Sequence, residues 1–273
     1  MTATTMTGAL VRRALPASRG GRGAHLLVER NAMVARRIWL LMVSGFFEPL
    51  FYLFSVGIGV GALVGRVPLP DGRLIGYSAF VAPALLASSA MNGAIYDSTF
   101  NIFFKLKYAK LYDAVLSTPL GTIDVAVGEI GWALIRGSVY AVAFLVVMLG
   151  MGLVGSWWAL LALPAAILIG FAFAAVGMAL TSYMKSWQDF EWVQLAILPM
   201  FMFATTFYPL GTYPRTLQIV VEATPLYHGI ELVRGLTTGS VGVGLLVHVS
   251  YLLAMGLAGL AVSARRLERL LLT

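Results

Sequence analysis

Six stretches of this sequence are predominantly apolar, and each is long enough to cross a lipid bilayer as a helix, which takes roughly 20 residues. Charged residues make up only 11% of the 273 residues, against about 25% in a soluble domain. The chain therefore lacks the polar surface that a water-soluble globule needs. We predict an all-α integral membrane protein with one transmembrane domain, residues 24–268. The predicted spans are residues 38–64, 74–96, 121–152, 157–183, 190–208 and 242–264.

Basic residues are concentrated on one side of these predicted spans. Most of the 19 Lys and Arg residues lie before the first span, between the second and third, between the fourth and fifth, or after the sixth. Cytoplasmic loops of membrane proteins carry such an excess of basic residues. Both termini are therefore predicted to be cytoplasmic, which requires an even number of spans. The net charge of +7 indicates contact with anionic lipid headgroups rather than with nucleic acid.

The residues that the sequence lacks exclude several kinds of chemistry. A chain without cysteine forms no disulfide, zinc–thiolate site or iron–sulfur cluster. His25, His228 and His248 fall in unlike environments, so no metal site is predicted. There is no Walker A sequence, so the chain has no ATPase site of its own. We predict a protein that is not an enzyme and binds no cofactor itself.

Two cytoplasmic segments outside the spans have amphipathic patterns. Residues 24–37 set apolar side chains against charged ones, and they predict a helix on the cytoplasmic membrane surface; a solvated helical lead-in to the first span is the alternative. Residues 98–118 place lysines between recurring apolar residues, which predicts a short amphipathic helix before the Thr118–Pro119 break. Residues 1–23, rich in Gly, Ser, Thr and Arg, are predicted to be a disordered basic tail.

A third segment, residues 205–240, lies on the opposite side of the membrane. Pro214 and Pro225 bracket an apolar stretch that is too short to span the bilayer. Apolar backbone of this length at membrane depth is tolerated where it packs against protein. The segment is therefore predicted to form a re-entrant or interfacial helix.

Charged residues inside predicted spans are costly unless they face protein or water. Glu48 is followed by Pro49, which removes a backbone donor and kinks a helix. The pair indicates either a polar group at a cavity or hinge, or a structural glutamate bonded to a neighbouring helix, and both interpretations stay open. In the third span Asp124, Glu129 and Arg136 favour a structural charge network over a proton path.

The order of these segments, together with several short motifs, resembles the permease subunits of ABC-2 type transporters. The strings FYPL at residues 207–210, TPLYH at 224–228 and RG at 234–235 match that family's most characteristic stretch. The string SGFFEPLFY at residues 44–52 is similar to the nodulation lipo-oligosaccharide export branch, the NodJ type, with daunorubicin-resistance permeases as more distant relatives.

This resemblance implies partners and a mechanism. Such permeases form homodimers or dimers of two related chains in the bacterial plasma membrane, and they bind two cytoplasmic ABC ATP-binding subunits, which hold ATP and Mg. The implied function is ATP-driven export of a lipid-like, glycolipid or drug-like amphipathic substrate. The rivals are a secondary transporter that works without ATP and a membrane-embedded enzyme that processes lipids.

The resemblance also implies roles for particular residues. Residues 100–113 would be the coupling helix, residues 24–37 the interface helix and residues 209–230 the re-entrant outer gate. The aromatic residues around Glu48 either line a substrate path or face lipid. The implied site residues are Lys105, Leu106, Lys107, Tyr108, Lys110 and Tyr112 for coupling; Glu29, Arg30, Arg36 and Arg37 in the interface helix; Phe47, Glu48, Pro49 and Tyr52 at the path or hinge; and Phe207, Tyr208, Pro209, Pro225, His228 and Arg234 at the outer gate.

Overall fold

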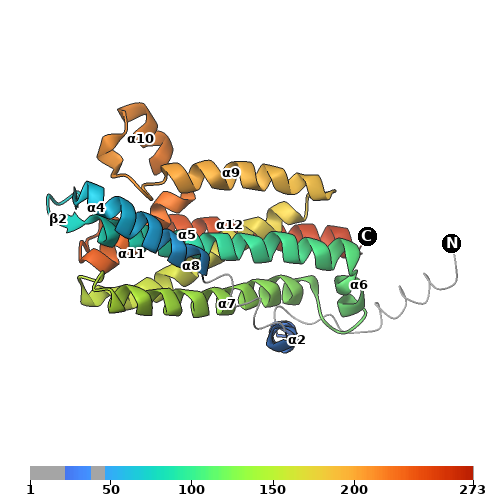
Figure 1. Ribbon diagram of the computed structural model, residues 1–273. Coiled ribbons are helices and arrows are strands. Elements are labelled where there is room, and N and C mark those ends of the chain that lie inside the picture. The colour runs from blue at the N-terminus through green and yellow to red at the C-terminus, as the bar shows by residue number, and fades with distance from the viewer. Residues whose placement is uncertain (1–21, 38–46, 273) are drawn as a thin grey trace, which may run out of the picture.

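Long helices that lie side by side make up most of the structure (Figure 1). The computed structural model describes residues 22–37 and 47–272. Within these residues, five helices are long and apolar enough to cross a membrane. They are Phe47–Val64, Tyr77–Tyr108, Thr122–Gly150, Trp157–Thr181 and Gly244–Leu270. Residues 38–46 of the predicted first span, and the predicted tail up to residue 21, lie outside the described residues.

Several of these helices contain more than one helical type. The first joins η1 (Leu53–Val60) to α4 (Gly61–Val64), and the second joins α5 (Tyr77–Tyr96) to η2 (Asp97–Asn101) and η3 (Phe104–Tyr108). The others are α7 (Thr122–Gly150), η4 with α8 (Trp157–Leu161, Ala162–Thr181) and α12 (Gly244–Leu272). The predicted bounds of the third and fourth spans agree with α7, and with η4 and α8 taken together, to within about two residues.

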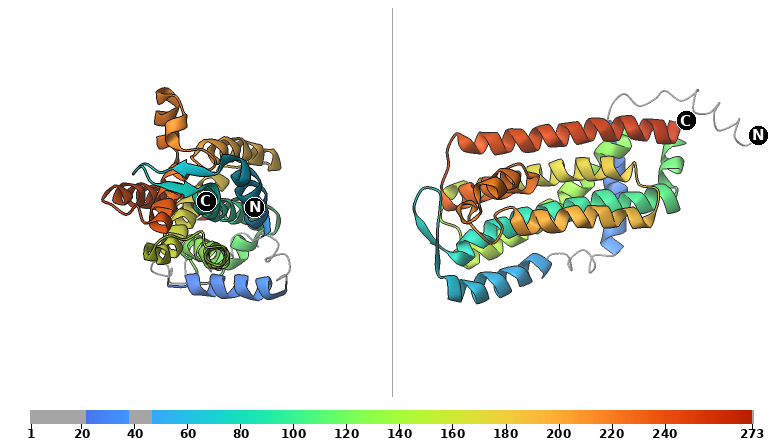
Figure 2. Two further views of the ribbon diagram at one scale, coloured as in Figure 1. Left: turned by 60° about the vertical axis from the view of Figure 1, so that its left-hand side comes forward. Right: turned by 90° about the horizontal axis from the view of Figure 1, so that it is seen from above.

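The predicted fifth span corresponds to a shorter helix. After η5 (Trp187–Asp189), α9 covers Phe190–Phe203, and it ends before the predicted residue 208. It lies alongside the bundle in both projections (Figure 1, Figure 2). Apart from Phe190, none of its residues is buried, so α9 presents an apolar surface along almost its whole length.

The second helix extends beyond the predicted span, although α5 itself ends at the predicted residue, Tyr96. The chain does not leave the helix at residue 96 but continues to Tyr108, and the bend comes at Lys110, whose φ of 45° is left-handed. Only α6 (Leu111–Leu116) forms a separate short helix. The predicted amphipathic helix at 98–118 is therefore the end of one long helix followed by a single short one.

Smaller elements gather at the two ends of the bundle (Figure 1). At one end lie α10 (Arg215–Glu222), α11 (Pro225–Thr238), the turn η6 (Leu210–Thr212) and a strand pair that the all-α prediction omitted. The strands β1 (Arg66–Pro68) and β2 (Leu74–Gly76) are antiparallel, with Val67 opposite Ile75. At the other end lie α6 and α2 (Ala24–Arg37), which crosses the bundle at a steep angle (Figure 2).

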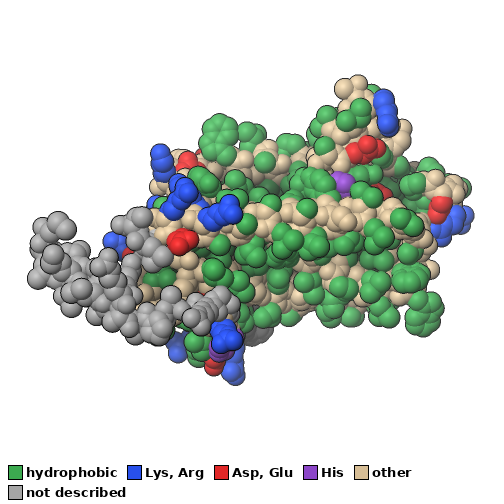
Figure 3. Space-filling model, turned by 180° about the vertical axis from the view of Figure 1, so that it is seen from behind, with side chains coloured by type: hydrophobic (Ala, Val, Ile, Leu, Met, Phe, Trp, Pro, Cys, Tyr) green, Lys and Arg blue, Asp and Glu red, His purple; other side chains and the backbone are tan. Residues whose placement is uncertain are grey.

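The surface matches a membrane setting. Hydrophobic side chains cover the length of the bundle, and Lys and Arg gather towards its ends (Figure 3). The most enclosed of the apolar helices is Tyr77–Tyr108, where 67% of the apolar window is buried inside the protein. The neighbouring helices α8 and α12 also pack closely, because glycines of α12 face α8. A Cβ at Gly259 would lie 2.7 Å from the backbone nitrogen of Val176.

Candidate functional site

A cavity of about 630 Å³ lies between the first helix, α5, α7 and α9. Its size falls in the range of drug-sized ligand pockets. Polar side chains project into it from all four helices, and aromatic rings complete its walls. The polar ones are Glu48, Ser88, Ser89, Asn92, Arg136 and Gln194. The aromatic ones are Tyr52, Tyr96, Phe100, Tyr140 and Phe201.

Three of the four residues predicted for a path or hinge line this cavity: Glu48, Pro49 and Tyr52. Glu48 and Tyr52 are four residues apart in one helix, so they lie on the same face. Phe47 does not line the cavity; its ring stacks on Phe51 with centroids 6.0 Å apart. Glu48 is exposed, and it has neither a hydrogen bond nor an ion pair to any described residue.

Arg136 is the cationic side chain of the cavity wall. It stands near the middle of the 29-residue α7, and its Nη2 lies 2.6 Å from Oδ1 of Asp97. The guanidinium also lies over the Tyr140 ring, 5.9 Å from the centroid. Asp97 is buried, with 4% of its side chain exposed. Its charge therefore offsets that of Arg136 at membrane depth.

Sequence reasoning missed much of this wall. Asp97 was not paired with Arg136, since the two belong to different helices. Ser88, Ser89 and Asn92 form a polar patch on one turn of α5, and that spacing was the available signal. Ser88 is buried, and its hydroxyl has no hydrogen-bond partner among the described residues, which is unusual for a buried polar group.

At the end of the bundle near α2, three elements meet at one carboxylate. Glu129 of α7 accepts hydrogen bonds at Oε2 from Nζ of Lys105, at 2.7 Å, and from Nδ2 of Asn31, at 3.0 Å. Lys105 Nζ also donates to Oδ1 of Asn31 at 3.1 Å. Asp124 accepts from the backbone nitrogens of Gly23 and Gly121. Asp124 and Glu129 thus bond α7 to the residues before α2, to Asn31 and to Lys105, whereas Arg136 lines the cavity.

This arrangement changes what the predicted coupling residues can present to a partner. Lys105 is mostly buried against Glu129, with 12% of its side chain exposed. Tyr112 is fully buried, and burial raises the pKa of its hydroxyl well above the ordinary value. Neither side chain therefore presents much surface to a partner in this structure. Lys107, Tyr108 and Lys110 are exposed, and Leu106 is half-buried.

The predicted interface helix coincides with α2. Leu27 and Asn31 are buried against α7, while Glu29, Arg36 and Arg37 are exposed and Arg30 is partly so. Leu26, Met33 and Val34 remain between 48% and 56% exposed. The helix thus keeps a free apolar strip beside its charges, as a surface-lying amphipathic helix does.

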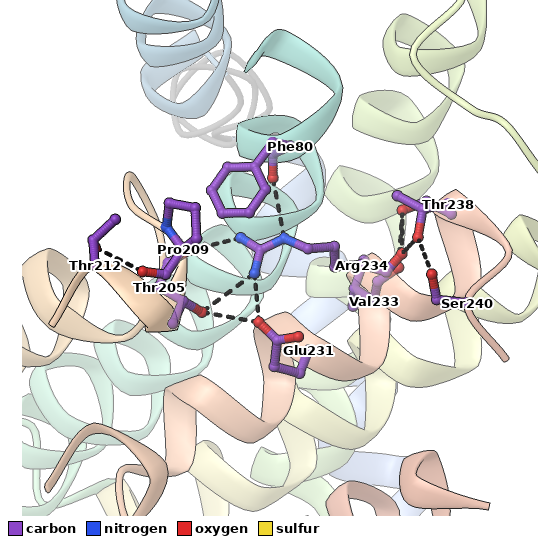
Figure 4. A network of polar contacts seen from close by, with 10 residues as sticks. Phe80, Thr205, Pro209, Thr212, Glu231, Val233, Arg234, Thr238 and Ser240 are labelled. Carbon is purple, nitrogen blue, oxygen red and sulfur yellow. Dashed lines mark hydrogen bonds and ion pairs between the residues drawn. The ribbon is translucent and has the colours of Figure 1, made fainter. Parts of the chain in front are cut away.

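At the opposite end, Arg234 is the centre of a polar network (Figure 4). Its guanidinium, 3% exposed, donates to the backbone oxygens of Thr205, at 2.6 Å, and Phe80, at 3.3 Å. It pairs with Glu231 at 2.5 Å and lies 3.9 Å from the centroid of the Phe80 ring. Thr205 adopts a φ of 61°, which is strained for a β-branched residue. The network fixes α11 to α5 and to the loop after α9.

The other predicted outer residues occupy different positions. His228 lies 2.7 Å from His248, nitrogen to nitrogen, so two of the histidines that the sequence placed in unlike environments are in contact. Still, no three candidate ligands come together to hold a metal within the described residues. Phe207 packs edge-on against Phe201 of the cavity wall, Pro225 begins α11, Pro209 precedes η6 and Tyr208 is exposed.

A membrane helix bundle with an internal, partly polar cavity is an arrangement found in transport proteins. The sequence model of the ABC-2 type transporter family matches residues 23–238. The chain belongs to that family, and the resemblance predicted from its motifs is confirmed.

Individual relatives agree with this assignment. Nodulation protein J of Rhizobium leguminosarum bv. viciae is 32% identical over 93% of this chain and 98% of its own length. Nodulation protein J of Rhizobium meliloti (strain 1021) is 31% identical over 89% of this chain and 92% of its own. A probable doxorubicin resistance ABC transporter permease of Mycobacterium tuberculosis is 24% identical over 89% of each chain.

Proposed function

We propose that this chain is the permease subunit of an ATP-driven exporter that moves an amphipathic substrate out of the cytoplasm or the inner leaflet. The observation that carries the proposal is the family match over residues 23–238. The substrate classes are lipid-like, glycolipid or drug-like molecules. The doxorubicin resistance named for one relative is an example of the last.

In this proposal the cavity is part of the substrate path. It combines polar groups at membrane depth with aromatic and aliphatic walls, which suits a molecule with a polar head and an apolar body. Polar residues within spanning helices mark substrate pathways in many membrane proteins. Glu48, Pro49 and Tyr52 are the path residues, and Pro49 allows the first helix to bend.

The membrane topology has six crossings, with α9 as the fifth. The turn η5 and α9 together cover Trp187–Phe203, slightly less than the roughly 20 residues of an average span. The complete permease lies in the plasma membrane and is a dimer, formed either by two copies of this chain or by this chain and a related one. Both termini are cytoplasmic, so α2 and α6 lie at the cytoplasmic surface among anionic headgroups.

Coupling to a cytoplasmic ATP-binding subunit, which holds ATP and Mg, takes place at residues 100–113. Lys107, Tyr108 and Lys110 form the docking surface because they are exposed beside the bend at Lys110. Lys105 and Tyr112 act from behind this surface, as buried supports. Lys105 also donates a hydrogen bond to Asn31 of α2. A displacement of the coupling segment is therefore transmitted directly to the interface helix.

The outer gate is the segment 209–230, which re-enters the outer end of the bundle. The Arg234 network anchors its C-terminal side, and Phe207 links it to the cavity through Phe201. Movement of this segment opens the outer end of the path after ATP binding brings the ATPases together.

The test is copurification of the full chain with the products of its genomic neighbours, followed by an ATP hydrolysis assay. We expect one ATP-hydrolysing subunit to remain bound. Lys107→Glu combined with Lys110→Glu should release it, while Lys185→Glu, a charge reversal at an exposed lysine between α8 and α9, should not. Absence of any bound ATPase would refute the proposal and favour an ATP-independent transporter.

A further inference from the structure

We infer that the cavity between the first helix, α5, α7 and α9 binds an organic ammonium ion, the amine of a monocationic amphiphile, with Glu48 as its counter-ion. This inference rests on the proposed function, because it names the class of cargo for the proposed path. Its basis is the charge balance of the cavity and the position of Glu48 beside Tyr52.

The charge balance comes first. Glu48 and Arg136 are the charged residues among those that line the cavity. Asp97 pairs with Arg136 at 2.6 Å, so the positive charge of the wall is already neutralised. Glu48 has no such partner among the described residues. The remaining charge of the cavity is therefore negative, and it selects a cation over an anion.

The surroundings of Glu48 suit an amine in particular. Tyr52 lies one helical turn further on and lines the same cavity. A carboxylate beside an aromatic face combines an ion pair with a cation–π contact, and aromatic rings are a common element of sites for organic ammonium ions. The Tyr52 ring is held in place by Phe201, whose centroid lies 5.8 Å away in an edge-on arrangement.

The rest of the cavity fits the body of such a molecule. The hydroxyl of Ser88 is buried in the wall without a hydrogen-bond partner among the described residues, so a ligand reaches it only if the α5 side of the cavity rearranges. Asn92 and Gln194 add amide groups that donate and accept. Tyr96 and Phe100, stacked with centroids 5.0 Å apart, provide an apolar wall. The volume of about 630 Å³ admits one drug-sized molecule.

The experiment uses a matched pair of fluorescent probes. Dansylcadaverine carries a primary amine, and its N-acetyl derivative has the same fluorophore and chain without the charge. The purified full chain is placed in phosphatidylcholine nanodiscs, and binding is read from dansyl fluorescence after subtraction of empty nanodiscs. We expect the amine to bind roughly ten- to a hundredfold more tightly, the range of one charge-assisted hydrogen bond.

Variants assign the difference to one carboxylate. Glu48→Gln should remove the preference for the amine, and Glu48→Asp should keep most of it. Glu191→Gln is the control, because Glu191 is an exposed carboxylate in α9 that does not line the cavity. Monodisperse elution of each variant shows that it is folded.

Equal affinity of the wild-type chain for the two probes would overturn the inference, and that comparison needs no variant. An unchanged preference in Glu48→Gln would overturn it too, as would tighter binding of a dansyl probe that carries a carboxylate. These readings need no ATPase, so they are independent of the copurification test. A failed copurification refutes the exporter, whereas failed probe binding refutes only the cargo class.

Discussion

Replacement of Arg234 by methionine should be among the most destabilising single changes in this chain. The guanidinium is 3% exposed and donates to four acceptors: the carboxylate of Glu231, the hydroxyl of Thr205, and the backbone oxygens of Thr205 and Phe80. Methionine fills much of the same volume but donates no hydrogen bond. The variant therefore leaves a carboxylate without its cation, and two backbone acceptors lose their donor.

The magnitude follows from these losses. Breaking a buried ion pair by removing one partner costs about 3–5 kcal/mol, and the lower end applies because Glu231 keeps 20% of its side chain exposed. The lost contact with the Phe80 ring adds about 1–2 kcal/mol. Hydrogen bonds between membrane helices add only about 0.6 kcal/mol each. We expect a loss of about 5 kcal/mol, which lowers Tm by on the order of 10 °C in a chain of this size.

The assay is thermal unfolding of the purified chain in one detergent, followed by size-exclusion chromatography of the folded fraction. Arg215→Met is the matched control, because Arg215 is exposed in α10 and donates to Gln218 at 3.0 Å; its effect should stay within about 0.5 kcal/mol. Adding Glu231→Gln to Arg234→Met should restore about 1–3 kcal/mol, since the unpaired carboxylate is then gone. If Arg234→Met unfolds at the same temperature as Arg215→Met, the network does not anchor α11.

Three further predictions concern other elements. Lys105→Met leaves Glu129 buried without its cation and should cost about 3 kcal/mol, whereas exposed Lys107→Met should be neutral in the same unfolding assay. Gly259→Ala places a Cβ 2.7 Å from the backbone of α8 and should cost about 1–3 kcal/mol, measured as above. Asp189 accepts from two backbone nitrogens, which lowers the pKa of its carboxyl below 3.8. Its stabilisation of the turn is therefore full above about pH 4 and is lost as pH falls through the lowered pKa. Hydrogen exchange at the bonded amides should show that dependence, and Asp189→Asn should abolish it.

Local periodicity explains which parts of the fold the sequence predicted well. The bounds of α2, Ala24–Arg37, match the prediction because its apolar and charged residues alternate with the helical period over the whole segment. The ends of α7 and α8 were close because Gly, Pro and Ser interrupt the apolar runs there. Hydropathy and helix-breaking residues are local features of the sequence. These boundaries can therefore be predicted without knowledge of tertiary contacts.

Contacts between distant residues explain what was missed. The lysines at 105 and 107 were assigned to a separate amphipathic helix, yet Lys105 is neutralised by Glu129 and the second long helix continues to Tyr108. The pairing of Arg136 with Asp97, and of His228 with His248, also joins separate helices. No pattern in a single sequence shows which helix faces pack together. Glu48 could therefore be predicted to lie at a cavity, but the other helices that form the cavity walls could not.

The acidic residues between the spanning helices show why Glu48 is the exception that matters. Asp97, Asp124 and Glu129 are all buried, and each has a basic or backbone N–H partner, as a carboxylate in a region of low dielectric requires. Glu48 is the carboxylate that lines the cavity, and no described residue compensates it. Glu48 is exposed rather than buried, so the structural requirement that pairs the other acids does not apply to it. The compensating charge is then supplied by what enters the cavity, and the first helix carries the group that selects it.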